Sequence, residues 1–179
     1  MPVLEPIAAE EQLFGDSVAC DIHARVGIAV GEPAPGSLDE AERVLRDIAT
    51  VDERRGEESD PSHTADPALR RVEAKLDLTL RLLSQALPGL QGPAFHAVRL
   101  SAHGLRIDAA EPWPEQGATL RWQPADWMPI CLSLPVTPLA RTTTQSWWAF
   151  QPLGESLADV VARHVFRLHR RWLATHRRD

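Results

Sequence analysis

The sequence predicts an α+β fold in which short strands form a small barrel or sandwich that carries two inserted helices and one C-terminal helix. Three observations lead to this prediction. Strand-like segments between 93 and 153 are separated by turns that contain Pro and Gly. Segments 37–52 and 66–87 have the apolar spacing of helices. A last segment with helical spacing starts at about Ser156.

The length and composition are those of a globular protein. A length of 179 residues suits one domain with an insertion, and 44% of the residues are hydrophobic. Cys20 and Cys131 belong to no CxxC or Cys/His cluster, so we expect neither a disulfide framework nor a zinc site. The first residues are acidic where a secretory signal would be basic, and no apolar run approaches the roughly 18 residues of a membrane span. We therefore expect a cytoplasmic protein without membrane insertion.

Charge is distributed unevenly along the chain. Residues 162–179 contain six Arg and one Asp, so the formal net charge of −6 leaves −11 on the rest of the chain. An acidic body argues against nucleic-acid binding by the whole protein. The basic segment has two interpretations, a docking surface for an acidic partner or a solvated helix face with arginines near a helix C-terminus.

The first strand and the first inserted helix follow from local patterns. Residues 12–30 contain alternating and β-branched positions, which predict one or two strands. Ser37 and Glu40 then form a capping-box pattern at the start of a helix. We expect this helix to fade near the charged run 52–56 and residues 53–66 to form a polar linker. The apolar face of this first inserted helix consists of Leu38, Ala41, Leu45 and Ile48.

The second inserted helix is the most unusual segment of the chain. Asp66 is an N-cap candidate followed by a proline, and Pro88 ends the pattern. Leu78 and Leu82 lie off the main apolar stripe, so the helix needs more than one neighbour. Self-association through this helix and packing within the monomer are both compatible with this pattern. The stripe consists of Leu69, Val72, Leu76, Leu80, Leu83 and Leu87.

The stretch from Val98 to Leu105, VRLSAHGL, resembles the PilZ signature Asp/Asn-x-Ser-x-x-Gly inside a strand-turn-strand. Segments 117–120, 148–153 and 157–171 resemble the next strand, the last barrel strand and the closing helix of PilZ domains. The resemblance implies a small antiparallel β-barrel built from 12–30 and 93–176, interrupted by a helical oligomerisation region at 37–88.

The resemblance also identifies a ligand motif and its loss. PilZ domains bind cyclic di-GMP with an Arg-x-x-x-Arg segment near the start of the barrel and with the Asp/Asn-x-Ser-x-x-Gly turn. In this chain Arg99 occupies the first position of the turn, and a guanidinium cannot accept a hydrogen bond from guanine. Ser101 and Gly104 remain, but no Arg-x-x-x-Arg precedes the turn. We therefore expect a degenerate motif without useful affinity for cyclic di-GMP.

The inserted helices resemble those of an atypical PilZ subgroup whose long helices assemble the domains into tetramers. This implies a homotetramer held by a helical bundle or coiled coil, in which the protein is an adaptor for signalling or pilus-related proteins of motility, type IV pilus or virulence pathways. The alternative is a receptor that still binds cyclic di-GMP or another nucleotide through Arg99, Arg106 and arginines of a neighbouring subunit.

No pattern predicts an enzyme, a cofactor or a metal site. Ser101 and His103 would point to opposite faces of a strand, and His164 and His169 are five residues apart on a helix. Two adjacent tryptophans on a strand must face opposite ways, so one is exposed or covers another element. Partner docking and burial against the helices are the two interpretations. The candidate docking residues are Trp147, Trp148, Arg163, Arg167 and Arg171.

Overall fold

The structure is a computed structural model that describes residues 4–57, 76, 79, 93–111, 113–114 and 117–176. The predicted second inserted helix, 66–87, lies outside the described residues except for Leu76 and Thr79, which are helical. The elements are, in chain order, α1 (Pro6–Phe14), β1 (Ala19–Val30), α2 (Ser37–Glu57), β2 (Phe95–Ser101), β3 (Gly104–Ile107), β4 (Ala118–Gln123), β5 (Leu132–Arg141), β6 (Ser146–Phe150) and α4 (Glu155–His176).

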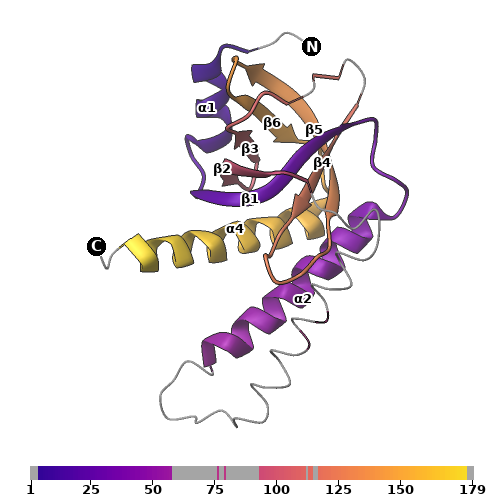
Figure 1. Ribbon diagram of the computed structural model, residues 1–179, viewed down its shortest axis with the longest axis vertical. Helices are drawn as coiled ribbons and strands as arrows, with labels where there is room; N and C mark the ends of the chain where they lie inside the picture. Colours follow the sequence, from indigo (N-terminus) through magenta and orange to yellow (C-terminus); the bar gives the residue numbers. More distant parts are fainter. Residues whose placement is uncertain are drawn as a thin grey trace.

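The six strands form a closed antiparallel barrel in the order β1-β2-β3-β6-β5-β4 (Figure 1). β1 is long enough to close it, because Ala19–Arg25 pairs with β2 and Arg25–Val30 pairs with β4. This confirms the predicted α+β fold with a small antiparallel β-barrel and a C-terminal helix. Closure also removes the unpaired sheet edges that an open sheet of this size would expose.

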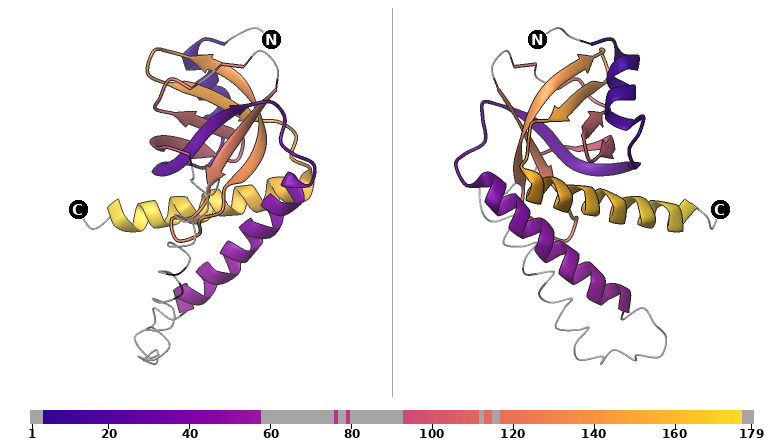
Figure 2. Two further views of the ribbon diagram at one scale, coloured as in Figure 1. Left: turned by 45° about the vertical axis from the view of Figure 1, so that its right-hand side comes forward. Right: turned by 180° about the vertical axis from the view of Figure 1, so that it is seen from behind.

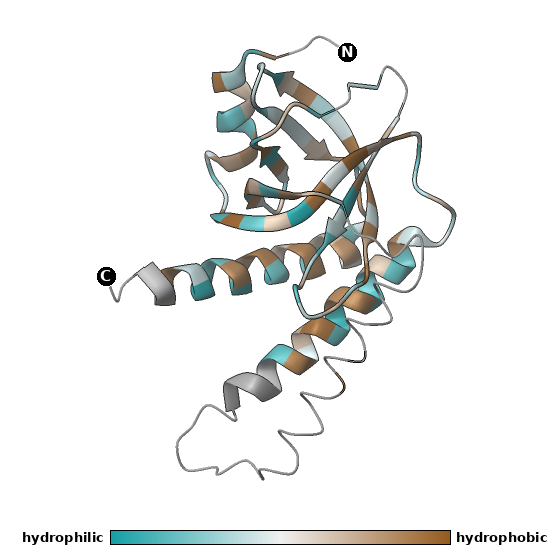
Figure 3. Cartoon of the chain, in the orientation of Figure 1, coloured by the Kyte–Doolittle hydropathy of each residue, from teal (hydrophilic) through white to brown (hydrophobic). Residues whose placement is uncertain are grey.

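One end of the barrel is covered by α4 and α2, which cross each other (Figure 2). Both helices carry apolar and polar bands, as Figure 3 shows. The predicted apolar faces are buried: Ala41, Leu45 and Ile48 of α2 join the main core. The main core also contains Leu157, Val161 and Val165 of α4 and the barrel residues Trp122, Leu134 and Trp148. No helix in the described part of the chain combines the length and apolarity needed to cross a bilayer.

Three sequence expectations for the first 57 residues are wrong in detail. Residues 12–14 end helix α1, and the strand predicted over 12–30 begins at Ala19. Pro6 in the first turn and a run of Ala, Glu and Gln favour this helix, and β-type alternation begins only after it. The capping box is not formed, because the backbone N–H of Glu40 donates to the Gly36 carbonyl at 3.0 Å and that of Ser37 donates to the Ala34 carbonyl at 3.1 Å. α2 also continues through the charged run to Glu57, so the expected linker overlaps its last turn.

Candidate functional site

Three polar side chains form a row across the outer face of the barrel. Arg99 of β2 is paired in register with Arg106 of β3, and Arg106 is paired with Trp147 of β6. Their strand neighbours Leu100, Leu105 and Trp148 are buried inside the barrel. Because side chains alternate between the two faces of a strand, this register places both guanidinium groups and the indole of Trp147 side by side on the outside.

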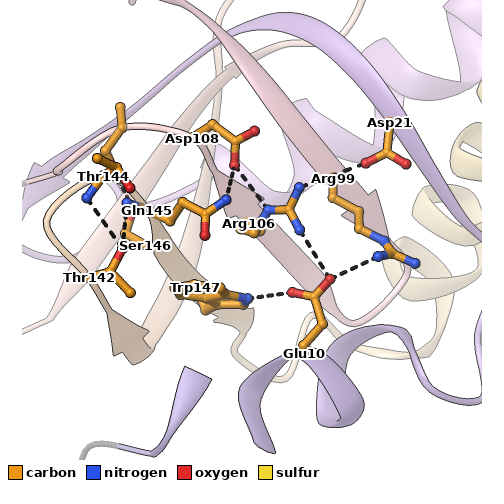
Figure 4. Close-up of polar contacts among 11 residues, drawn as sticks. Glu10, Asp21, Arg99, Arg106, Asp108, Thr142, Thr144, Gln145, Ser146 and Trp147 are labelled. Atoms are coloured by element: carbon orange, nitrogen blue, oxygen red, sulfur yellow. Dashed lines mark hydrogen bonds and ion pairs between the residues drawn. The ribbon is translucent and has the colours of Figure 1, made fainter. Parts of the chain in front are cut away.

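Glu10 of α1 joins this row with its carboxylate (Figure 4). One carboxylate oxygen accepts from Arg99 at 2.8 Å and from Arg106 at 3.1 Å. The other oxygen accepts from Nε1 of Trp147 at 2.7 Å. Arg106 also donates to Asp108 at 3.0 Å. Two arginines directly opposite each other on adjacent strands repel, so the carboxylate between them supplies the compensating negative charge.

Ser101 holds the C-terminal end of α1. Its hydroxyl donates to the carbonyl of Leu13 at 2.7 Å and accepts from the backbone N–H of His103 at 3.1 Å. The last carbonyls of a helix have no partner within the helix, so a side-chain donor at this place satisfies one of them. The Ser101 hydroxyl is therefore committed to α1 and to its own turn, and His103 meets it through its backbone.

Gly104 allows two elements to pack closely against the turn. A Cβ at this position would lie 2.1 Å from the carbonyl oxygen of Trp148 and 3.0 Å from Cδ2 of Leu13. The approach to the backbone oxygen excludes any side chain at this position, whereas the Leu13 side chain would only have to shift slightly. The glycine thus lets β3 pair closely with β6 and lets α1 lie against the turn.

All three residues of the degenerate motif contact α1. Arg99 binds Glu10 and also lies over the ring of Phe14, with 4.9 Å between its Cζ atom and the ring centroid. Ser101 binds the Leu13 carbonyl, and Gly104 makes room for the Leu13 side chain. The face that the resemblance predicts as the ligand face is therefore covered by a helix of the same chain. We name the surface of Arg99, Ser101, Gly104, Arg106 and Trp147 the α1 seat.

Comparisons with known proteins identify the family of this chain. The family model described as "Atypical PilZ domain, cyclic di-GMP receptor" matches residues 45–178. This chain belongs to the atypical PilZ domain family. A solved structure of a pathogenic protein from Xanthomonas campestris, described as a tetrameric PilZ domain self-assembled via an unusual helical bundle, is 33% identical, with a TM-score of 0.73. The match covers 94% of this chain and 97% of that chain. No curated protein matches the sequence.

The adjacent tryptophans Trp147 and Trp148 are both buried in the single chain. Trp148 points into the barrel and lies 5.5 Å from the ring of Trp113. Trp147 points outward but is covered by α1, where it packs with Ala9, Leu13 and Phe14. Trp148 lies inside the barrel and Trp147 lies beneath α1, so neither is exposed to a partner in the single chain, and their role in docking stays a prediction. The alternative, that one tryptophan covers another element, describes Trp147.

The candidate arginines of α4 lie on a different surface from the α1 seat. Arg163 pairs with Asp159 one turn before it, and Arg171 pairs with Asp52 of α2. Arg163 and Arg167 border a cavity of about 560 Å³ beside the half-exposed Phe166. These arginines therefore do not supply the missing Arg-x-x-x-Arg segment to the face of Arg99.

The predicted oligomerisation stripe is described at one position. The backbone of Leu76 is helical, and the residue is 57% exposed in the single chain. The other members of the stripe, Leu69, Val72, Leu80, Leu83 and Leu87, lie outside the described residues. A leucine exposed to this extent on an apolar helix is consistent with a surface that another chain covers.

The two histidines of α4 that were weighed as metal ligands, His164 and His169, pack within the fold. His164 is buried, with its ring 5.3 Å from that of Trp122. Its pKa is lowered to about 4, first because burial disfavours the charged imidazolium and then because Arg167 and Arg171 lie nearby. Nδ1 of His169 lies 2.9 Å from the carbonyl of Ala19. Among the described residues no group of three or more His, Cys, Asp or Glu side chains converges on a common point.

The sequence did not identify α1 or Glu10 as part of the site. The segment 6–14 carries a helix signal in its proline and its Ala, Glu and Gln content. The pairing of Glu10 with Arg99 joins residues 89 positions apart, and no local pattern reports such a contact. The one sequence feature that hints at this contact is Arg99 itself, a positive charge with no acidic partner within the motif.

Proposed function

We propose that this chain is a non-enzymatic, oligomeric PilZ adaptor of cyclic di-GMP-linked signalling that does not itself bind cyclic di-GMP. The observation that carries the proposal is the occupation of the ligand face by α1. Arg99 stands where the family motif has Asp or Asn, and its guanidinium is bound by Glu10. In the segment before β1, where PilZ receptors carry two arginines, this chain presents a carboxylate.

The electrostatics of this face oppose a nucleotide. A cyclic dinucleotide carries two phosphate charges, and its approach to Arg99 and Arg106 would bring them beside Glu10. Displacing α1 would also expose the buried Ala9, Leu13 and Phe14. Both costs add to the loss of the guanine acceptor, so ligand binding has to overcome three separate penalties.

Isothermal titration of the full-length protein with cyclic di-GMP tests this part of the proposal. We expect no heat of binding at ligand concentrations up to about a hundred micromolar. Low-micromolar binding to the unmodified protein would contradict the proposal. A known PilZ receptor titrated in the same buffer serves as the positive control.

Assembly is the second part of the proposed function. The exposed Leu76 and the apolar stripe to which it belongs support a homotetramer built on the 66–87 helix, and the Xanthomonas relative is described as a tetramer with a helical bundle. Assembly would present several barrels in one particle to a signalling or pilus-related partner in the cytoplasm. Such multivalency raises the avidity of weak contacts without new interactions.

Light scattering on stripe variants tests assembly. Leu76→Asp combined with Leu83→Asp is expected to reduce the solution mass toward one chain, because charged residues cannot be buried unpaired in a helical bundle. Val30→Asp is the matched control, since Val30 is 71% exposed at the end of β1. An unchanged solution mass in the double variant would show that the 66–87 helix is not part of the interface between chains.

The alternative function is a receptor for cyclic di-GMP or another nucleotide. The adjacent guanidinium groups of Arg99 and Arg106 favour it, since such a pair binds phosphate well. A panel of nucleotides tested for shifts in melting temperature separates the two functions, because a ligand of the native state must stabilise it. A shift that disappears in Arg99→Ala would support the receptor.

A further inference from the structure

We propose that the α1 seat is a docking site for an amphipathic helix that carries a carboxylate, and that α1 is its occupant within the chain. The proposal rests on the adaptor function and names the chemistry of its partner. That partner is a helix with a Glu or Asp next to a small residue, followed one turn later by a pair of large apolar residues. The same pattern in α1 is Ala9, Glu10, Leu13 and Phe14.

The seat is built to receive one acidic group. Arg99, Arg106 and Trp147 come from three different strands, and their donor atoms lie 2.7 to 3.1 Å from the oxygens of a single carboxylate. Without Glu10, Arg99 would lose its carboxylate partner, whereas Arg106 would keep Asp108 at 3.0 Å and Asp21 at 3.9 Å. Ser101 adds a fourth donor that captures the end of the helix. The barrel therefore presents a binding site for one carboxylate and a donor for the last turn of a helix, next to the apolar residues Leu139 and Ala140.

The apolar contacts of α1 are separate from the core that holds the barrel together. Ala9, Leu13 and Phe14 pack with Leu139, Ala140 and Trp147 in a second cluster outside the barrel. The main core, inside the barrel and under α2 and α4, does not include them. Release of α1 would uncover the second cluster and leave the main core in place, so the cost of exchange is local.

α1 itself has little intrinsic stability. It is nine residues long and its N-cap residue Glu5 makes no side-chain capping bond. Glu11 lies in its last turn, where the helix dipole disfavours negative charge, and this turn has no basic residue. Helices of this length are marginal in water, so the seat supplies most of the stabilisation of α1. A helix held in this way can be replaced by another helix with the same side chains.

The position of the seat suits a partner. α1 and the far end of α2 lie at opposite ends of the molecule (Figures 1 and 2). If the chains assemble through the inserted helices, the α1 seats point away from the assembly. A cleft of about 630 Å³ remains open beside α1, bordered by Ile7, Arg106, Gln145 and Trp147. Ile7 is 83% exposed at its edge, so an incoming helix meets apolar surface before α1 leaves.

Binding of the α1 peptide in trans tests the proposal. The probe is a fluorescent peptide of residues 4–18, and the receptors are the full-length protein and its Glu10→Ala variant, compared by fluorescence anisotropy. In the unmodified protein the tethered α1 has an effective concentration of the order of millimolar, so the peptide competes poorly. Glu10→Ala removes the carboxylate from the tethered helix alone, so the peptide is expected to bind at least tenfold more tightly.

Matched variants separate the seat from nonspecific binding. Glu11→Ala makes the same change one residue later on the exposed side of α1 and is expected to leave peptide affinity unchanged. A peptide with Glu10→Ala is expected to lose the gain. Leu13→Ala weakens the tethered helix from its apolar side and is expected to raise affinity as Glu10→Ala does, which covers the case in which one variant folds poorly.

Three outcomes overturn the proposal. The first is no peptide binding to Glu10→Ala or Leu13→Ala protein that is folded by circular dichroism. The second is equal binding to the Glu10→Ala and Glu11→Ala proteins. The third is binding of inorganic phosphate or cyclic di-GMP to the Glu10→Ala protein in place of the peptide, which would make the seat an anion site. Binding of cyclic di-GMP to the unmodified protein would instead contradict the proposed adaptor function.

Discussion

The burial of His164 predicts a loss of stability in mild acid that a single substitution removes. The imidazole lies against Trp122 and is 1% exposed, and its pKa in the folded protein is about 4, against 6.5 for the ordinary group. Arg167 and Arg171 add to the effect of burial, and only Asp52 among the nearby charged groups opposes it. Between these two values the unfolded chain binds a proton that the folded chain excludes, so stability falls as the pH falls.

The magnitude follows from the two pKa values. Proton linkage gives a loss of about 2 kcal/mol from this one group between pH 7 and pH 5, approaching about 3 kcal/mol below pH 4. Most of the change lies below pH 6.5, where the unfolded chain becomes protonated. A loss of this size is a large fraction of the 5 to 15 kcal/mol that stabilises a typical domain.

Urea unfolding followed by tryptophan fluorescence measures this loss. The wild-type protein and His164→Leu are unfolded at pH 7 and pH 5 at one protein concentration, because self-association makes stability depend on concentration. Carboxylates contribute equally to both proteins, so the difference between their pH dependences isolates His164. His164→Leu is expected to lose about 2 kcal/mol less than wild type. Equal losses in the two proteins would refute the reasoning.

Two substitutions in the α1 seat have expected effects of different size. Gly104→Ala places a Cβ 2.1 Å from the Trp148 carbonyl oxygen and is expected to cost at least about 2 kcal/mol in urea unfolding. Gly27→Ala in β1 is the control and should cost less than about 1 kcal/mol, because its closest contact is 3.1 Å. An equal loss of unfolding free energy in Gly104→Ala and Gly27→Ala would show that Gly104 has no special packing role. Ser101→Ala removes the bond to the Leu13 carbonyl and is expected to cost about 1 kcal/mol. Unchanged stability, with unchanged protection of the α1 amides from hydrogen exchange, would show that this bond does not hold the helix.

The barrel and its closing helix are predictable from this sequence because their signals are local. The alternation of Val98, Arg99 and Leu100 reports which side of a strand each residue occupies, and the structure follows it. The stripe from Leu157 to Val165 likewise reports the buried face of α4. Ser101 and Gly104 identify the turn and its place between two strands.

The part of the site that the sequence did not reveal depends on contacts between distant segments. Arg99 meets Glu10 because α1, which precedes β1, packs against β5 and β6 on the outside of the closed barrel. Trp147 was a candidate for exposure because a strand has two faces, and only the packing of α1 shows that its outer face is covered. The match of Ser101 and Gly104 to the family signature implied a ligand, whereas in the structure Ser101 binds the end of α1 and Gly104 leaves space for Leu13.

We propose that this PilZ domain acts by assembly and does not bind cyclic di-GMP. The most direct test is the solution mass of the full-length protein by light scattering, with and without cyclic di-GMP, at a concentration where both can be measured. We predict a mass of several chains, close to four, that is the same in both samples. A mass of one chain, or a mass that changes when cyclic di-GMP is added, would contradict the account.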